Sequence, residues 1–155
     1  MKTLHIVPHT HWDREWYQTF QGFRLKLIRV VDDLIQCLES RDDILCFHFD
    51  GQTIVLDDYL EICPENRERL ARLIAQQRIL NGPWYCMPDE NLVSGEALIR
   101  NLQKGIAKCA EWGTPFWPMG DLCDTFGHTP QMPQILRGFG IRSAILGRGT
   151  NDHTT

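Results

Sequence analysis

The densest group of residues able to do chemistry is His9-Thr10-His11-Trp12-Asp13, near the N-terminus. In an extended backbone His9, His11 and Asp13 would project to one side, because successive side chains alternate. Imidazole nitrogens and carboxylate oxygens are ligands that Zn²⁺ and similar divalent ions accept. The pattern therefore predicts a metal site, and the spacing alone leaves open which two of the three side chains bind the ion.

A second group lies between Gly120 and Pro130, where Asp121 and Asp124 follow a predicted strand. Parallel strands deliver their outgoing loops to the same edge of a sheet, so Asp121 or Asp124 is expected beside the N-terminal group. The alternative is that both aspartates only form the turn and cap before the next helix. His128 is expected to be a hydrogen-bonding loop residue rather than a ligand.

A third group, residues 82–90, ends on Asp89 and Glu90, two acids that we expect to be exposed. Aromatic rings beside carboxylates are typical of sugar sites, because the C–H face of a sugar packs on a ring while its hydroxyls bond to polar groups. Trp16 and Tyr17, in a polar loop, are the better ligand contacts, whereas Trp84 fits the core. The aromatic residues expected around this edge are Trp12, Trp16, Tyr17, Trp84 and Tyr85.

The elements that must position these groups alternate between strand and helix patterns. Short apolar runs predict strands at about 3–7, 44–49, 84–87, 116–119 and 141–146, and Asp50-Gly51 is a turn signal after the second. Apolar residues spaced by three and four predict helices over about 22–40, 53–60, 64–77, 94–113 and 130–137. This alternation predicts the α/β class, with a mostly parallel β-sheet and covering helices.

Composition excludes several classes of protein. The 155 residues, 43% hydrophobic and 23% charged, fit about one globular domain. A net charge of −4 without a run of Lys or Arg argues against a nucleic-acid partner, and no apolar run reaches the roughly 20 residues of a membrane helix. The N-terminus lacks the apolar core of a secretory signal. Single, dispersed cysteines fit reduced thiols, so we expect a cytoplasmic protein; they are Cys37, Cys46, Cys63, Cys86, Cys109 and Cys123.

Three segments carry a resemblance to a known family. HTHWDREWY, GPWYCMPDENLVSGEALIRN and DLCDTFGHTPQMPQILRGFGI resemble, in order and spacing, the N-terminal part of the catalytic domain of class II α-mannosidases, glycoside hydrolase family 38. The form W-D-R-E-W-Y is similar to the bacterial branch, which includes mannosylglycerate hydrolases. The resemblance implies a β/α-barrel-like domain of the glycoside hydrolase/deacetylase type and retaining hydrolysis of an α-mannosidic bond.

The resemblance also implies roles for individual residues. His11, Asp13 and Asp124 match ligands of a divalent ion, usually zinc, and Asp124 also matches the carboxylate nucleophile. Trp16 and Phe126 match residues lining the mannose site, which would take an α-mannoside or a mannosylglycerate-like substrate. His9 is not a ligand in the family's pattern.

In the family the general acid and a further His ligand come from later sequence. We therefore expect residues 1–155 to form a single partial domain, with negligible activity and weak metal affinity alone. We also expect apolar surface and a free sheet edge to cause self-association. Two alternatives remain: a metal-dependent carbohydrate deacetylase, in which the ion activates water, and a non-catalytic carbohydrate-binding domain.

Overall fold

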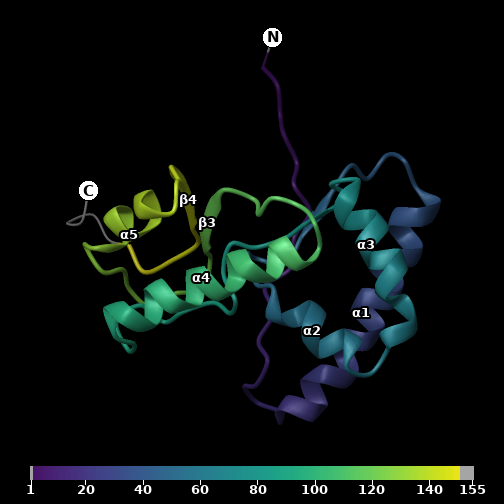
Figure 1. Cartoon of the computed structure of the whole chain (residues 1–155), viewed down its shortest axis with the longest axis horizontal. Helices are drawn as coiled ribbons and strands as arrows, with labels where there is room; N and C mark the ends of the chain where they lie inside the picture. Colours follow the sequence, from purple (N-terminus) through teal and green to yellow (C-terminus); the bar gives the residue numbers. More distant parts are fainter. Residues whose placement is uncertain (1, 151–155) are drawn as a thin grey trace.

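A computed structural model describes residues 2–150, along which helices and strands alternate. The helices are α1 (Phe20–Ser40), α2 (Ile54–Leu60), the short 3₁₀ helix η1 (Pro64–Asn66), α3 (Arg67–Ala75), α4 (Gly95–Glu111) and α5 (Met132–Gly138). The strands are β1 (Phe47–His48), β2 (Ile79–Leu80), β3 (Met119–Leu122) and β4 (Ser143–Leu146). Figure 1 shows two groups of elements, with α1, α2 and α3 on one side and α4, α5, β3 and β4 on the other.

The first group encloses a core of apolar side chains from α1, α2 and α3. Helix α1 forms because its apolar residues recur on one face, and Thr19 caps its start by accepting a hydrogen bond from the Gly22 N–H. The fully buried members of this core include Val31, Ile35, Val55, Tyr59 and Leu70.

The second core joins α4 and α5 to β3. Ser94 caps α4 through the Ala97 N–H, as its position before an apolar-periodic segment predicts. Trp84 is completely buried in this core, so its predicted core role is confirmed. The remaining buried members are Leu98, Leu102, Leu122, Met132, Leu136 and Ile141.

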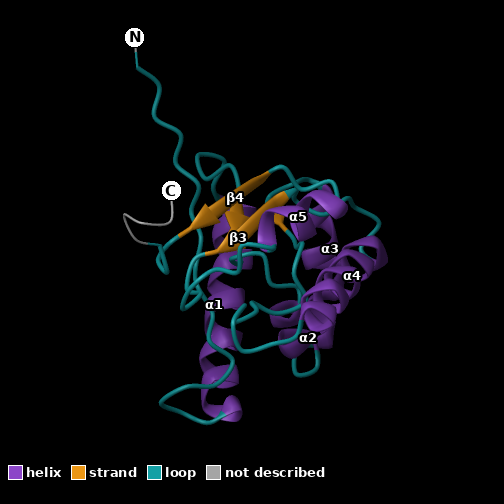
Figure 2. Ribbon diagram, turned by 90° about the vertical axis from the view of Figure 1, so that its left-hand side faces the viewer, coloured by secondary structure: helices purple, strands orange, loops and turns teal. Residues whose placement is uncertain are grey.

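The strands are parallel, as predicted, but within residues 2–150 they form two separate two-stranded sheets. β1 pairs with β2, and β3 pairs with β4 with Met119 opposite Ser143. Figure 2 shows β3 and β4 side by side, with α5 next to them. Isolated bridges join His9 to His48 and Gln52 to Trp84, which bring the segments around them together.

Two predicted strands are absent from the described residues. Residues 3–7 have no regular structure, because Leu4 and Ile6 are exposed and the first backbone hydrogen bond of this segment is accepted by the Pro8 carbonyl, from the His48 N–H. Residues 84–87 do not form a strand either. The side-chain oxygen of Asn101 in α4 accepts from the N–H groups of Tyr85 and Cys86, so these groups are not available to a ladder.

The other predicted strands are displaced or shorter, and β2 was not predicted. The strand predicted at 116–119 lies at 119–122, because Pro118 has no N–H and the Trp117 N–H bonds to the Asn81 carbonyl. Asp121 therefore lies within β3 rather than in a loop. The segments 44–49 and 141–146 are reduced to 47–48 and 143–146.

All five predicted helices are present, with ends that differ by a few residues. The segment 64–77 begins as η1 and continues as α3, which ends at Ala75 before Gln77 adopts a φ of 57°. Among the described residues no helix is long and apolar enough to cross a membrane.

Candidate active site

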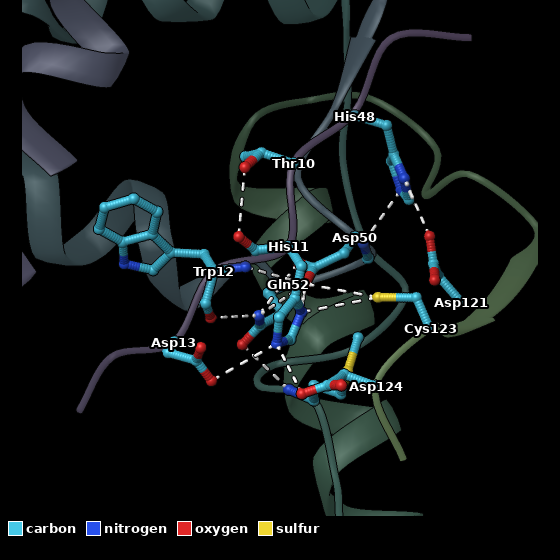
Figure 3. Close-up of polar contacts among 12 residues, drawn as sticks. Thr10, His11, Trp12, Asp13, His48, Asp50, Gln52, Asp121, Cys123 and Asp124 are labelled. Carbon is cyan, nitrogen blue, oxygen red and sulfur yellow. Dashed lines mark hydrogen bonds and ion pairs between the residues drawn. The ribbon is translucent and has the colours of Figure 1, made fainter. Parts of the chain in front are cut away.

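His11 lies at the centre of the polar cluster drawn in Figure 3. The segment that carries it is fixed to β1 by a hydrogen bond of 3.2 Å from the Thr10 N–H to the His48 carbonyl. From there His11 Nε2 lies 3.4 Å from Asp13 Oδ1 and 3.2 Å from Asp124 Oδ2. The structure thus brings together three side chains from two groups that are far apart in the sequence.

The Nε2 atom of His11 is buried and makes no hydrogen bond, although two carboxylate oxygens lie near it. Two atoms bound tetrahedrally by one zinc ion at about 2.0–2.1 Å stand roughly 3.3 Å apart, which agrees with both contacts. His11, Asp13 and Asp124 offer one ligand atom each, all within 4.8 Å of one another. These residues therefore fit a divalent ion such as zinc.

Asp50, which the sequence indicated only as part of a turn, is completely buried on the other face of His11. Its Oδ2 lies 2.5 Å from His11 Nδ1. This hydrogen bond, with the weaker contact of His11 to Cys123 at 3.5 Å, raises the pKa of His11 from 6.5 to about 11 despite burial. An acid directly after an apolar run was the only signal for Asp50 in the sequence.

Asp124 has a second partner, Arg148, in the segment after β4. Arg148 Nη2 lies 2.6 Å from Asp124 Oδ1, and the guanidinium also donates to the Asp124 carbonyl. The same guanidinium lies 3.8 Å from the centre of the Phe126 ring. Arg148 could not be predicted from the sequence, because a single arginine in a polar segment follows no pattern.

Asp121 does not join the cluster. Of the two aspartates that we considered as partners of the N-terminal group, Asp124 lies there and Asp121 does not. It is buried in β3, and its Oδ2 lies 3.4 Å from Nδ1 of the buried His48 (Figure 3). Asp121 lies within β3, where the alternation of side chains directs it to the face that His48 occupies. Asp124 lies beyond the end of the strand and contacts His11 instead. His9 is exposed and contributes to neither of the potential metal-ligand groups of the described residues.

A hollow of about 360 Å³ opens beside the cluster. His11, Asp13 and Asp124 line it together with Trp12, Asp89 and Phe126. Phe126 is 64% exposed at this hollow. Trp16 is 62% exposed but does not line the hollow, and Tyr17 packs edge-on against Phe23 with ring centres 5.1 Å apart.

The prediction that Asp89 and Glu90 are both exposed is wrong. Glu90 is buried, because its carboxylate accepts hydrogen bonds from the Thr129 N–H and from His128 Nδ1. His128 also contacts the Arg148 carbonyl through Nε2 at 2.8 Å, so its predicted role as a hydrogen-bonding loop residue is confirmed. Asp89 is half-buried and lines the hollow.

A larger hollow of about 670 Å³ lies between α5 and β4. Its walls are mainly apolar, with Leu122, Met132, Leu136 and Ile141 among them, and no Asp or Glu lines it. Of these two hollows among the described residues, the smaller one combines acids with His11 and is therefore the candidate active site.

Comparison with known proteins assigns the chain to a family of glycosyl hydrolases. Residues 1–155 match the family model described as the glycosyl hydrolases family 38 N-terminal domain. The chain belongs to glycosyl hydrolase family 38, and the resemblance of its three motifs to that family is confirmed.

Individual relatives agree with this assignment. The chain is 45% identical over 148 residues to a protein of Halalkalibacterium halodurans assigned as a mannosylglycerate hydrolase, covering 96% of this chain and 16% of that protein. It is 30% identical over 146 residues to human alpha-mannosidase 2C1, covering 90% of this chain and 13% of the relative.

A solved structure supports the fold. The crystal structure of an alpha-mannosidase from Enterococcus faecalis V583 matches with a TM-score of 0.90 and 37% identity, over 94% of this chain and 16% of that one. The chain therefore spans about a sixth of the length of its bacterial relatives. None of the three relatives is described as a deacetylase or as a non-catalytic carbohydrate-binding protein.

Proposed function

We propose that this chain supplies the nucleophile and metal ligands of a retaining hydrolase that cleaves α-mannosidic bonds. The observation that carries the proposal is the convergence of Asp13 and Asp124 on the unpartnered Nε2 of His11 beside a sugar-sized hollow. Membership of family 38 supports the reaction class.

His11, Asp13 and Asp124 would hold a divalent ion, which we propose is zinc. When bound, the ion would supply positive charge that orients sugar hydroxyls and helps to distort the ring towards the transition state. The further histidine ligand that the family resemblance implies would come from outside this chain.

Asp124 is the proposed nucleophile. Its carboxylate would form a bond to the anomeric carbon while the bond from that carbon to the leaving oxygen breaks, and a carboxylic acid roughly 5–5.5 Å away would protonate the leaving oxygen. Water would then release the sugar from Asp124. The family resemblance implies that the general acid comes from later sequence, and we propose the same here; Glu90 and Asp121 are engaged in buried contacts within the chain.

The substrate would be an α-mannoside or a mannosylglycerate-like compound, as the names of the relatives support. Phe126 would pack on the sugar from its place at the hollow. Trp16 would reach the same sugar only from the rim, since it does not line the hollow itself.

The finer fold and location are proposals as well. We infer that residues 1–155 form part of a larger β/α-barrel-like catalytic domain, which the parallel strands and the 16% share of the solved relative support. All six cysteines lie within the described residues and carry free thiols, which supports a cytoplasmic location.

A chimera tests the function. The segment of the Halalkalibacterium halodurans relative that matches this chain would be replaced by residues 1–155, and hydrolysis of an activated aryl α-mannoside would be measured with added zinc. We expect turnover with retained anomeric configuration, and a loss of at least about a thousandfold in Asp124→Asn, because the nucleophile is removed.

The matched control is Asp43→Asn, which changes an exposed aspartate in a surface pair with Arg41. Full activity of the Asp124→Asn chimera, or an inverted product, would contradict the proposal. The isolated chain should show negligible turnover, whereas robust turnover would mean that an acid within the chain, such as Asp89, Glu90 or Asp121, is sufficient.

We also propose that the isolated chain self-associates. Every residue of β4 is exposed, and this strand pairs only with β3 among the described residues. Free strand edges and exposed apolar side chains such as Ile145 and Leu146 favour association. Light scattering should give a mass above 18.0 kDa at high concentration; a monomer there would contradict the proposal.

A further inference from the structure

We propose that Asp50 is the positioning residue that presents the Nε2 atom of His11 to the cation, an inference that rests on the proposed function. Asp50 lies on the Nδ1 side of the imidazole ring, opposite to Asp13 and Asp124 on the Nε2 side (Figure 3). It would act through His11 and would touch neither the ion nor the sugar.

The two nitrogens of the His11 ring face different groups. Nδ1 lies 2.5 Å from Asp50 Oδ2, and Nε2 faces the carboxylates of Asp13 and Asp124. An ionised carboxylate only accepts hydrogen bonds, so Nδ1 carries the hydrogen in this contact. Nε2 is then the one ring nitrogen whose lone pair can bind a cation once it has lost any proton of its own, and its basicity is increased by the negative charge behind Nδ1.

Asp50 is itself held firmly. Its Oδ2 accepts from the Trp12 N–H at 3.2 Å, and both of its carboxylate oxygens accept from Gln52 Nε2. Gln52 also donates to the Trp12 carbonyl at 2.9 Å and accepts from the Met87 N–H at 3.1 Å. This network fixes the carboxylate and ties it to the two segments that border the hollow.

The backbone that displays Asp50 is unusual. Asp50 has a φ of +36° and Gly51 a φ of +79°. Non-glycine residues in the left-handed region are uncommon and persist where the surroundings determine them. Here the Gly51 N–H donates to Nε2 of the buried His48 at 3.1 Å, which fixes a turn that directs the Asp50 side chain towards His11.

A second set of ligand atoms lies on the Nδ1 side, from His11, Asp50 and Cys123. The distance of 2.5 Å between Nδ1 and Asp50 Oδ2 is well below the roughly 3.3 Å that separates two ligands of one tetrahedral zinc. The distances on the Nε2 side, 3.2 and 3.4 Å, agree with that separation. The geometry therefore assigns the ion to Nε2 and the hydrogen bond to Nδ1.

Zinc chloride titrated into the ¹⁵N-labelled full chain tests this assignment. Imidazole ¹⁵N spectra should show zinc on His11 Nε2 and a hydrogen retained on Nδ1. Calorimetry should show that Asp50→Asn weakens zinc binding about tenfold to a hundredfold, the usual effect of losing a hydrogen-bonded carboxylate behind a ligand. Asp121→Asn is the matched control, because this buried acid contacts His48 instead, and it should leave zinc affinity unchanged. Cys123→Ser should also leave the zinc affinity unchanged.

The outcomes separate this inference from the proposed function. Zinc on Nε2 with equal affinities for wild type and Asp50→Asn, or zinc on Nδ1 of the wild type, would overturn the role of Asp50 alone. Absence of any zinc binding by the wild type would overturn the proposed metal site and this inference with it. The spectrum of the wild type keeps the test valid even if Asp50→Asn does not fold.

Discussion

Arg148 and Asp124 form an ion pair of 2.6 Å although they lie on either side of α5 in the sequence. Arg148 bonds to Oδ1 of Asp124, while Oδ2 of the same carboxylate faces His11. The two oxygens are therefore held by different partners, and the orientation of the proposed nucleophile depends on a residue that follows β4.

Arg148→Gln should consequently impair the chimera described above. Since misplacing a reacting group by about 1 Å can cost up to about a hundredfold in rate, we expect kcat to fall tenfold to a hundredfold. KM should change less than kcat, because Arg148 does not itself line the hollow and reaches it only through its contact with Phe126. Arg142→Gln, which changes an exposed arginine near the start of β4, is the control. Equal kcat values for the two variants would show that Arg148 does not orient Asp124.

Zinc binding should depend on pH through His11. Asp50 raises the pKa of His11 to about 11 in the chain without metal, so the ring carries an extra proton at neutral pH. Zinc must displace this proton, and its affinity should rise about tenfold per pH unit below that pKa. Calorimetry in buffers of different ionisation enthalpy should detect about one proton released per ion; affinity independent of pH would contradict this.

The same shift affects the stability of the metal-free chain. Because the folded-state pKa lies above the unfolded value of about 6.5, the stabilisation is complete below pH 6.5 and is lost as the pH rises through about 11.

His128 should be a protonated histidine at mildly acidic pH. Both of its ring nitrogens face acceptors, the Glu90 carboxylate and the Arg148 carbonyl, and only the imidazolium donates to both. Burial opposes the charge, but these hydrogen bonds raise the pKa of His128 above 6.5. Its stabilisation is therefore present below pH 6.5 and is lost as the pH rises through the raised pKa. An NMR titration checks this, and a midpoint below 6.5 would refute it.

Gly105→Ala should destabilise the chain. A Cβ at Gly105 would lie 2.1 Å from the Pro83 carbonyl oxygen and 2.3 Å from the Trp84 carbonyl carbon, both backbone atoms. An overpacking cost near 3 kcal/mol outweighs the gain of about 1 kcal/mol from alanine in a helix, so the free energy of unfolding should fall by roughly 2 kcal/mol.

Gly95→Ala is the matched control in the same helix, because nothing lies within 4 Å of its added Cβ. Chemical denaturation of both variants measures the difference. A Gly105→Ala protein as stable as the control would mean that α4 does not rest on the 83–85 backbone.

The sequence predicted the helices better than the strands. A helix such as α4 carries its own signals, an apolar stripe and the Ser94 cap, and both lie within the segment. A strand depends on a partner elsewhere in the chain. Residues 3–7 have the composition of a strand but no neighbour, and β3 begins only after Pro118, where hydrogen bonding to β4 becomes available.

For the candidate site, the sequence indicated the proposed metal ligands but not the residues that surround them. His11, Asp13 and Asp124 belong to motifs with local spacing, and the rule that parallel strands share an edge predicted that Asp121 or Asp124 would approach the N-terminal group. Only the family resemblance selected His11, Asp13 and Asp124 from the candidates. The residues around them were not predictable. Asp50 and Arg148 act only through tertiary contacts, which leave no periodic trace in the sequence.

The hollow is lined by residues from segments next to each of the two hydrophobic cores. Trp12, between His11 and Asp13, packs against the first core, and Asp124 follows β3 of the second. An ion bound by His11, Asp13 and Asp124 would cross-link the two parts of the molecule. The unfolding temperature would then depend on the zinc concentration: added zinc would raise it, and a chelator would lower it.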